Sequence, residues 1–153
     1  MRIVKGVAAC LAAMSLLMGV PASAGEMSQA EKLRRLDIML MVTGLRCRTT
    51  AENFQADYGR FTTNHIGMLN AASNSLKAEM ALRHGAAGAN RALDRFSTTM
   101  ANNYGNGHPW LGCGELKMVV RNLAAVRGMA PLEAAADQLL AESGSSQIAW
   151  ARR

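Results

Sequence analysis

The sequence predicts an all-α protein, a small bundle of four main helices and a short C-terminal helix, with one disulfide. Apolar residues recur at spacings of three and four along most of the chain, which places them on one face of a helix. Aromatic residues make up only 5 % of the sequence while Ala, Leu and Met are abundant, a composition typical of helical proteins. Alternating apolar and polar residues form no run long enough to predict a strand.

The stretch from Ala51 to Gly85 shows the helical pattern most clearly, and we expect the rest of the chain to pack around it. Polar side chains fall mostly between the apolar positions, so the helix has one apolar and one polar face. Thr49 or Thr50 is expected to cap its start, whereas Gly67 could kink or divide it near His65. The residues expected to face the core are Phe54, Tyr58, Phe61, His65, Met68, Ala72, Leu76 and Met80.

Residues 1–24 are typical of a secretory signal peptide. Arg2 and Lys5 give a positive start, an uncharged apolar run follows, and Ala22-Ser23-Ala24 supplies the small residues that a signal peptidase recognises. The apolar run is shorter than the about 20 residues of a membrane span, which argues against an anchor. We therefore expect a periplasmic or secreted helical domain, residues 25–143, followed by a mobile tail, residues 144–153.

One of the three cysteines lies in the segment that would be removed, which leaves Cys47 and Cys113. An exported chain meets an oxidising compartment, where an even cysteine count predicts a disulfide. Two cysteines allow one intramolecular pairing, and the long loop that it closes would contribute on the order of 4 kcal/mol. The alternative is a reactive thiol or metal pair, but the Cys-x-x-Cys motif of thioredoxin-like redox proteins is absent.

The other expected helices have recognisable start and stop signals. Ser28 and Glu31 form a capping box before the first helix. Pro109 suits the first turn of the fourth helix, and a glycine-rich loop precedes it. Gly144-Ser145-Ser146 is expected to end the fifth helix. The expected ranges are Gln29–Arg48, Ala89–Tyr104, Pro109 to Gly128 and Pro131–Glu142.

Tyr104, His108 and Trp110 are the first candidate binding residues, because they surround the glycine-rich loop beside the expected disulfide. Loops on a rigid scaffold often carry function. The same stretch is also an ordinary connection between helices, with Trp110 capping the core. His65 is a further candidate, although a lone histidine on an apolar stripe is more often a core residue bonded to a backbone carbonyl.

Positive charge is spread among acidic residues instead of forming a continuous basic face on any helix. We therefore expect no nucleic acid as a partner, whereas anionic envelope components would be favoured by long-range attraction. Arg46 and Arg48 flank Cys47, and they could mark an anion site or simply point to solvent. No stretch after Ala24 is long and apolar enough to predict a membrane span.

We expect no metal centre and no cofactor. Candidate metal ligands stand singly, without the helical spacing that brings two of them onto one face. The motifs of the hydrolase nucleophile elbow, of Walker-type phosphate loops and of c-type haem attachment are absent. The ligands considered are His65, His84, His108, Asp57 and Glu115.

Four segments resemble a family of small exported proteins of Gram-negative bacteria: Leu36–Arg48, Asn53–Tyr58, Met100–Gly105 and Trp110–Cys113. The resemblance spans roughly Leu33 to Arg127. The family has no assigned activity, although some members carry the label S-adenosyl-L-homocysteine hydrolase. That label belongs to a large two-domain, nicotinamide-dependent enzyme. This chain has neither the length nor the dinucleotide motif of that enzyme, so the label does not transfer. The resemblance implies export and the Cys47–Cys113 pair, and no catalytic residue.

These observations favour a non-enzymatic binding or interaction module in the periplasm. Its partner would be an unidentified envelope protein or small ligand. The alternative is a small, hydrolase-like envelope enzyme that uses His108 or His65 as its acid–base group.

Overall fold

The computed structural model describes residues 27–150 of the chain, and the side chains of residues 27–140. The expected signal peptide, residues 1–24, lies outside the described residues. Within them every regular element is a helix, and Cys47 is bonded to Cys113, so the all-α fold with one disulfide is confirmed. The helices are α1 (Gln29–Cys47), α2 (Gln55–His84), α3 (Ala86–Tyr104), α4 (Cys113–Ala125) and α5 (Ala130–Trp150).

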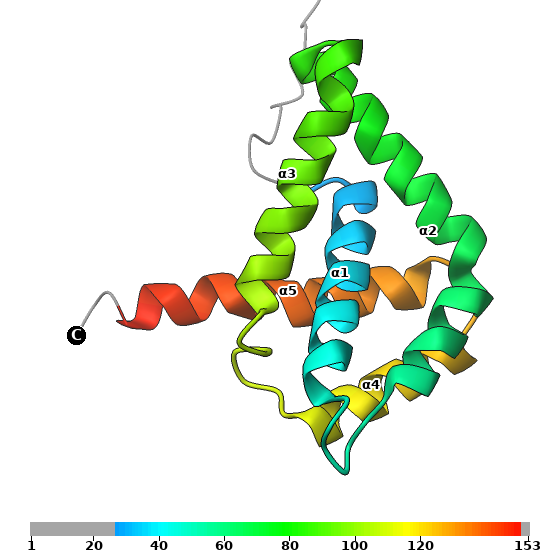
Figure 1. Cartoon of the computed structure of the whole chain (residues 1–153), viewed down its shortest axis with the longest axis vertical. Coiled ribbons are helices and arrows are strands. Elements are labelled where there is room, and N and C mark those ends of the chain that lie inside the picture. The colour runs from blue at the N-terminus through cyan, green and yellow to red at the C-terminus, as the bar shows by residue number, and fades with distance from the viewer. Residues whose placement is uncertain (1–26, 151–153) are drawn as a thin grey trace, which may run out of the picture.

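The central helix is α1, and not the stretch from Ala51 to Gly85 around which we expected the chain to pack. α1 contacts each of the other four helices and lies between them (Figure 1). Leu36, Ile38 and Met39 are each at most 2 % exposed, although their positions point to different sides of a helix. The apolar arc of α1 is therefore wide enough to be covered from several directions.

α2 is one continuous helix of 30 residues, so the expected kink near His65 and Gly67 is absent. Its inward stripe is confirmed from Phe61 to Met80, except that Leu69 is buried where Met68 is only half-buried. Gly85, with a φ of +74°, ends α2 and directly precedes α3, as a residue without a Cβ permits. From this turn α2 and α3 diverge, with α1 between them (Figure 1).

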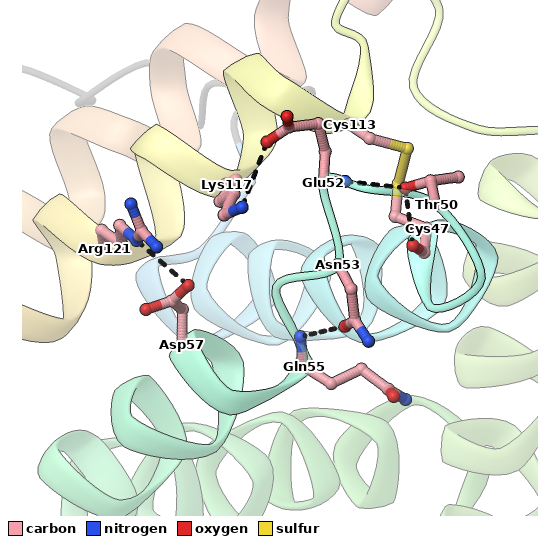
Figure 2. Close-up of polar contacts among 9 residues, drawn as sticks. All are labelled: Cys47, Thr50, Glu52, Asn53, Gln55, Asp57, Cys113, Lys117 and Arg121. Carbon is pink, nitrogen blue, oxygen red and sulfur yellow. Dashed lines mark hydrogen bonds and ion pairs between the residues drawn. A yellow bond between two sulfur atoms is a disulfide. The ribbon is translucent and has the colours of Figure 1, made fainter.

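The start of α2 is organised by Asn53, and the predicted caps Thr49 and Thr50 are wrong. Asn53 Oδ1 accepts a hydrogen bond from the Gln55 amide at 3.0 Å, a local side-chain contact that satisfies a free helix donor (Figure 2). Thr50 Oγ1 instead donates to the Cys47 carbonyl at 2.8 Å. Thr50 therefore closes the last turn of α1, and α2 begins five residues later.

The two last helices also differ from the sequence-based ranges. α4 begins at Cys113 and not at Pro109, because Gly112 is its N-cap and Glu115 accepts from the Gly112 amide at 2.8 Å. α5 continues through Gly144-Ser145-Ser146 to Trp150, so it is neither short nor broken there. One glycine costs a helix about 1 kcal/mol, which is not enough by itself to end it.

A polar network connects α1 with α2 and α3. Tyr58 on α2 donates its hydroxyl to Asp37 Oδ1 at 2.8 Å, and Arg34 Nη1 donates to Asp37 Oδ2 at 3.1 Å. Arg34 Nη2 also lies 3.5 Å from Ser97 Oγ on α3. Burial and the neighbouring Asp37 carboxylate raise the pKa of Tyr58, so its hydroxyl stays a donor.

Candidate functional site

Three contacts along one face of α4 hold that helix against the corner between α1 and α2 (Figure 2). Cys113, Lys117 and Arg121 are spaced by four residues, so they point to the same side of the helix. Together they fix where α4 lies, and two hollows border this contact. Cys113 is bonded to Cys47, with a Cα–Cα distance of 5.8 Å. Lys117 Nζ lies 3.1 Å from Glu52 Oε2, and Arg121 Nε lies 3.2 Å from Asp57 Oδ2.

The first hollow is a cavity of about 140 Å³ beside the disulfide, between the end of α1, the 105–112 loop and the start of α4. This volume is close to that of an apolar protein cavity that holds benzene, about 150 Å³, although polar residues also line this space. Its wall combines the two half-cystines with two leucines and with polar groups of the loop. Its lining includes Arg46, Cys47, Gly107, His108, Leu111, Cys113 and Leu116.

The predicted binding residues Tyr104, His108 and Trp110 do lie together beside this cavity. The His108 ring stacks on Tyr104 with centroids 6.0 Å apart and meets Trp110 edge-on at 4.5 Å. His108 lines the cavity and is buried, whereas Trp110 is half-buried and is not part of the cavity wall. Of the three, His108 is the one whose side chain forms the cavity wall.

Both ring nitrogens of His108 have partners that fix its orientation. Nε2 donates to the Leu139 carbonyl on α5 at 3.3 Å, and Nδ1 accepts from the Leu111 amide at 3.3 Å. The ring therefore ties the 105–112 loop to α5, and both of its nitrogens are already engaged.

Arg46 brings a positive charge to the same cavity, although the residue is exposed. Its Nη1 lies 3.4 Å from the Gly105 carbonyl, and its side chain packs over Gly107. A Cβ on Gly107 would lie 3.3 Å from Arg46 Nε. The φ of Gly107, +104°, also favours glycine at this position. Arg48 is exposed and is not part of the cavity wall.

His65 lies elsewhere, at the contact between α2 and α4. The side chain is 1 % exposed, and Nε2 donates to the Leu123 carbonyl at 2.7 Å. Its neighbour Asn64 donates from Nδ2 to the Ala124 carbonyl at 2.8 Å. The two side chains thus satisfy carbonyls in the last turn of α4, which have no partner within the helix. The interpretation of His65 as a core residue bonded to a backbone carbonyl is confirmed.

Sequence reasoning missed the buried carboxylate of Asp57. Its side chain is 5 % exposed and lies between the guanidinium groups of Arg60 and Arg121. Burial raises the pKa of Asp57, but hydrogen bonds and charge from the two arginines outweigh burial and hold it below its usual value. The helical spacing offered a signal, since Asp57 falls on the stripe between Phe54 and Phe61.

The second hollow lies next to this cluster, on the outer side of the contact between α2 and α4. It is a groove of about 320 Å³ lined by Arg60, Asn64, Arg121, Ala124 and Ala125. Arg60 and Arg121 are 67 % and 56 % exposed, so their charges border the groove while Asp57 lies beneath them. The groove and the cavity share no lining residue.

Among the described residues, no three His, Cys, Asp or Glu side chains gather closely enough to hold a metal ion. Within the same part of the chain, no helix has both the length and the apolar composition that crossing a membrane requires. Comparisons with protein-family models, with curated proteins and with solved structures give no match. The family resemblance of the sequence therefore stays a prediction.

Proposed function

We propose that the protein is an exported, periplasmic binding or interaction module and that its ligand occupies the cavity beside the disulfide. The observation that carries the proposal is the meeting of Arg46, His108 and the Cys47–Cys113 bridge around one space of about 140 Å³. Export is supported by the composition of residues 1–24 and by a disulfide of the kind that persists in oxidising compartments.

The wall of the cavity indicates the chemistry of the ligand. Leu111, Leu116 and the disulfide sulfurs supply an apolar surface, and the Arg46 guanidinium supplies donors at one side. A matching ligand has an apolar body of about benzene size and one hydrogen-bond acceptor. It could be a free small molecule or the tip of a side chain of an envelope protein.

The alternative, a small hydrolase-like enzyme using His108 or His65, has less support. A general acid–base group must have a ring nitrogen within reach of the substrate. The nitrogens of His108 are bonded to Leu139 and Leu111, and Nε2 of His65 is bonded to Leu123 in the core. A hydrolase screen of the purified protein, repeated with His65→Gln and His108→Gln, separates the two functions. Activity that either substitution abolishes would favour the enzyme.

Ligand binding at the cavity can be tested by NMR on the purified oxidised protein. The probe is a library of benzene-sized compounds that each carry one carbonyl group. We expect binding compounds to shift the amide signals of Gly107, His108 and Cys113, and Arg46→Gln to weaken their binding. Arg48→Gln is the matched control, because that arginine does not line the cavity, and it should leave binding unchanged. Compounds that bind only at other surfaces, or none that bind, would contradict the assignment of the site.

A further inference from the structure

We infer that the groove between α2 and α4 is a second binding site, specific for a small carboxylate ligand. The groove is lined by Arg60, Asn64 and Arg121, with Ala124 and Ala125 at its end toward the C-terminus of α4. Its volume of about 320 Å³ falls within the range of small-molecule sites in proteins. The site is separate from the cavity of the proposed function, so the two proposals stand or fall independently.

The charges around the groove favour an anion with one negative charge. Arg60 and Arg121 both pair with the same carboxylate, Asp57. Two guanidinium groups and one carboxylate leave one positive charge, which a single carboxylate would neutralise. Because Asp57 is buried and the two arginines are more than half exposed, the unbalanced charge lies on the groove side.

The geometry of Arg121 leaves its bidentate edge available. Its bond to Asp57 Oδ2 is made through Nε at 3.2 Å. Within the described part of the chain, Nη1 and Nη2 of Arg121 make no hydrogen bond. These two nitrogens form a planar pair that matches the two oxygens of a carboxylate. Asp57 therefore holds the guanidinium in place and leaves its far edge without a hydrogen bond among the described residues.

The end of a helix would normally repel an anion, because its last carbonyls carry partial negative charge. Here two of those carbonyls are already bonded, Leu123 to His65 and Ala124 to Asn64. The two carbonyl oxygens are thus engaged in hydrogen bonds with side chains of α2. This capping lowers the repulsion at the end of α4 that borders the groove.

The test is an NMR titration of the oxidised protein in which acetate replaces chloride at constant ionic strength, so that general screening does not change. We expect saturable shifts of the side-chain signals of Arg60, Asn64 and Arg121. Arg121→Lys keeps the charge that pairs with Asp57 but removes the planar fork, and it should weaken acetate binding about tenfold. Arg127→Gln, an exposed arginine outside the groove, should bind acetate like the unchanged protein.

A parallel titration with inorganic phosphate distinguishes the class of anion. We expect phosphate to bind more weakly than acetate, because desolvating its second negative charge costs more than a site with one unbalanced positive charge recovers. The proposal is overturned if acetate causes no saturable shift, if it shifts all arginines alike, if phosphate binds more tightly, or if Arg121→Lys binds acetate as well as the unchanged protein. None of these outcomes depends on whether the cavity beside the disulfide binds a ligand.

Discussion

Arg121 Nε donates to Asp57 Oδ2 at 3.2 Å across the contact between α4 and α2, two helical turns beyond the disulfide at Cys113. This ion pair, the Lys117–Glu52 pair and the disulfide form one row along α4 (Figure 2). The row fixes α4 relative to α1 and α2, and both proposed sites border it. The first two predictions concern the members of this row.

Asp57→Asn should lower the free energy of unfolding at neutral pH by about 1–3 kcal/mol, because hydrogen bonds between charged groups are replaced by weaker ones. The pKa of Asp57 is lower in the folded protein than its usual value, so the carboxylate stabilises the fold above the unfolded pKa of about 3.9. That contribution is lost as the pH falls through the folded pKa. The stability gap between the two proteins should therefore shrink below about pH 4.

Urea unfolding at a series of pH values measures this effect. The exposed Asp94, which lies on α3, provides the control Asp94→Asn, and its stability should differ from that of the unchanged protein by no more than about 0.5 kcal/mol at any pH. A gap for Asp57→Asn that stays constant down to pH 2 would show that the buried ion pair is not the source of the stabilisation.

Replacing Cys47 and Cys113 together by alanine should cost about 4 kcal/mol of stability. The bridge joins residues separated by 66 positions, and the chain-entropy model gives this magnitude for a loop of that length. Urea unfolding of the double variant and of the oxidised protein gives the difference directly. Equal stabilities would mean that the bridge does not restrict the unfolded chain as we infer.

Two glycines in helices should respond to alanine in opposite directions. A Cβ on Gly67 would meet nothing within 4 Å, so Gly67→Ala should raise stability by up to about 1 kcal/mol through helix propensity. A Cβ on Gly44 would lie 3.2 Å from Cε2 of the fully buried Phe54, and Gly44→Ala should lower the melting temperature. A drop in melting temperature for Gly67→Ala would argue against a continuous α2.

His65 should stabilise the contact between α2 and α4 through its donor nitrogen. His65→Gln keeps an N–H that can reach the Leu123 carbonyl, whereas His65→Leu leaves that buried carbonyl without a partner. The leucine variant should be less stable by about 1–3 kcal/mol, and the glutamine variant should recover part of this loss. Hydrogen exchange at the end of α4 reports the same contact, and equal protection in the two variants would contradict this role.

The sequence predicted the elements that depend on local patterns and missed those that depend on distant partners. The stripe from Phe61 to Met80, the disulfide and the grouping of Tyr104, His108 and Trp110 follow from spacing, cysteine count and proximity in the chain. Asp57 fits the same helical spacing between Phe54 and Phe61, but its buried carboxylate pairs with Arg121, which is 64 residues away. No local pattern identifies that partner.

The choice of central helix shows the same limit. The stretch from Ala51 to Gly85 has the longest periodic pattern. Such a pattern shows that a helix has one apolar face, but it does not show where the helix lies in the bundle. The helix that contacts all the others needs apolar residues on several sides, and α1 has them in Ile38, Met39 and Leu40. A regular stripe therefore marks a helix at the edge of a bundle as readily as one at its centre.

The intact mass of the protein purified from its native host tests the central claim, an exported module clamped by one disulfide, most directly. The mass should correspond to a chain that begins at Gly25, lower by two hydrogen atoms because Cys47 and Cys113 are joined. Reduction should restore those two hydrogens and release two thiols for labelling. A chain that still begins at Met1, or that carries both thiols free before reduction, would contradict the account.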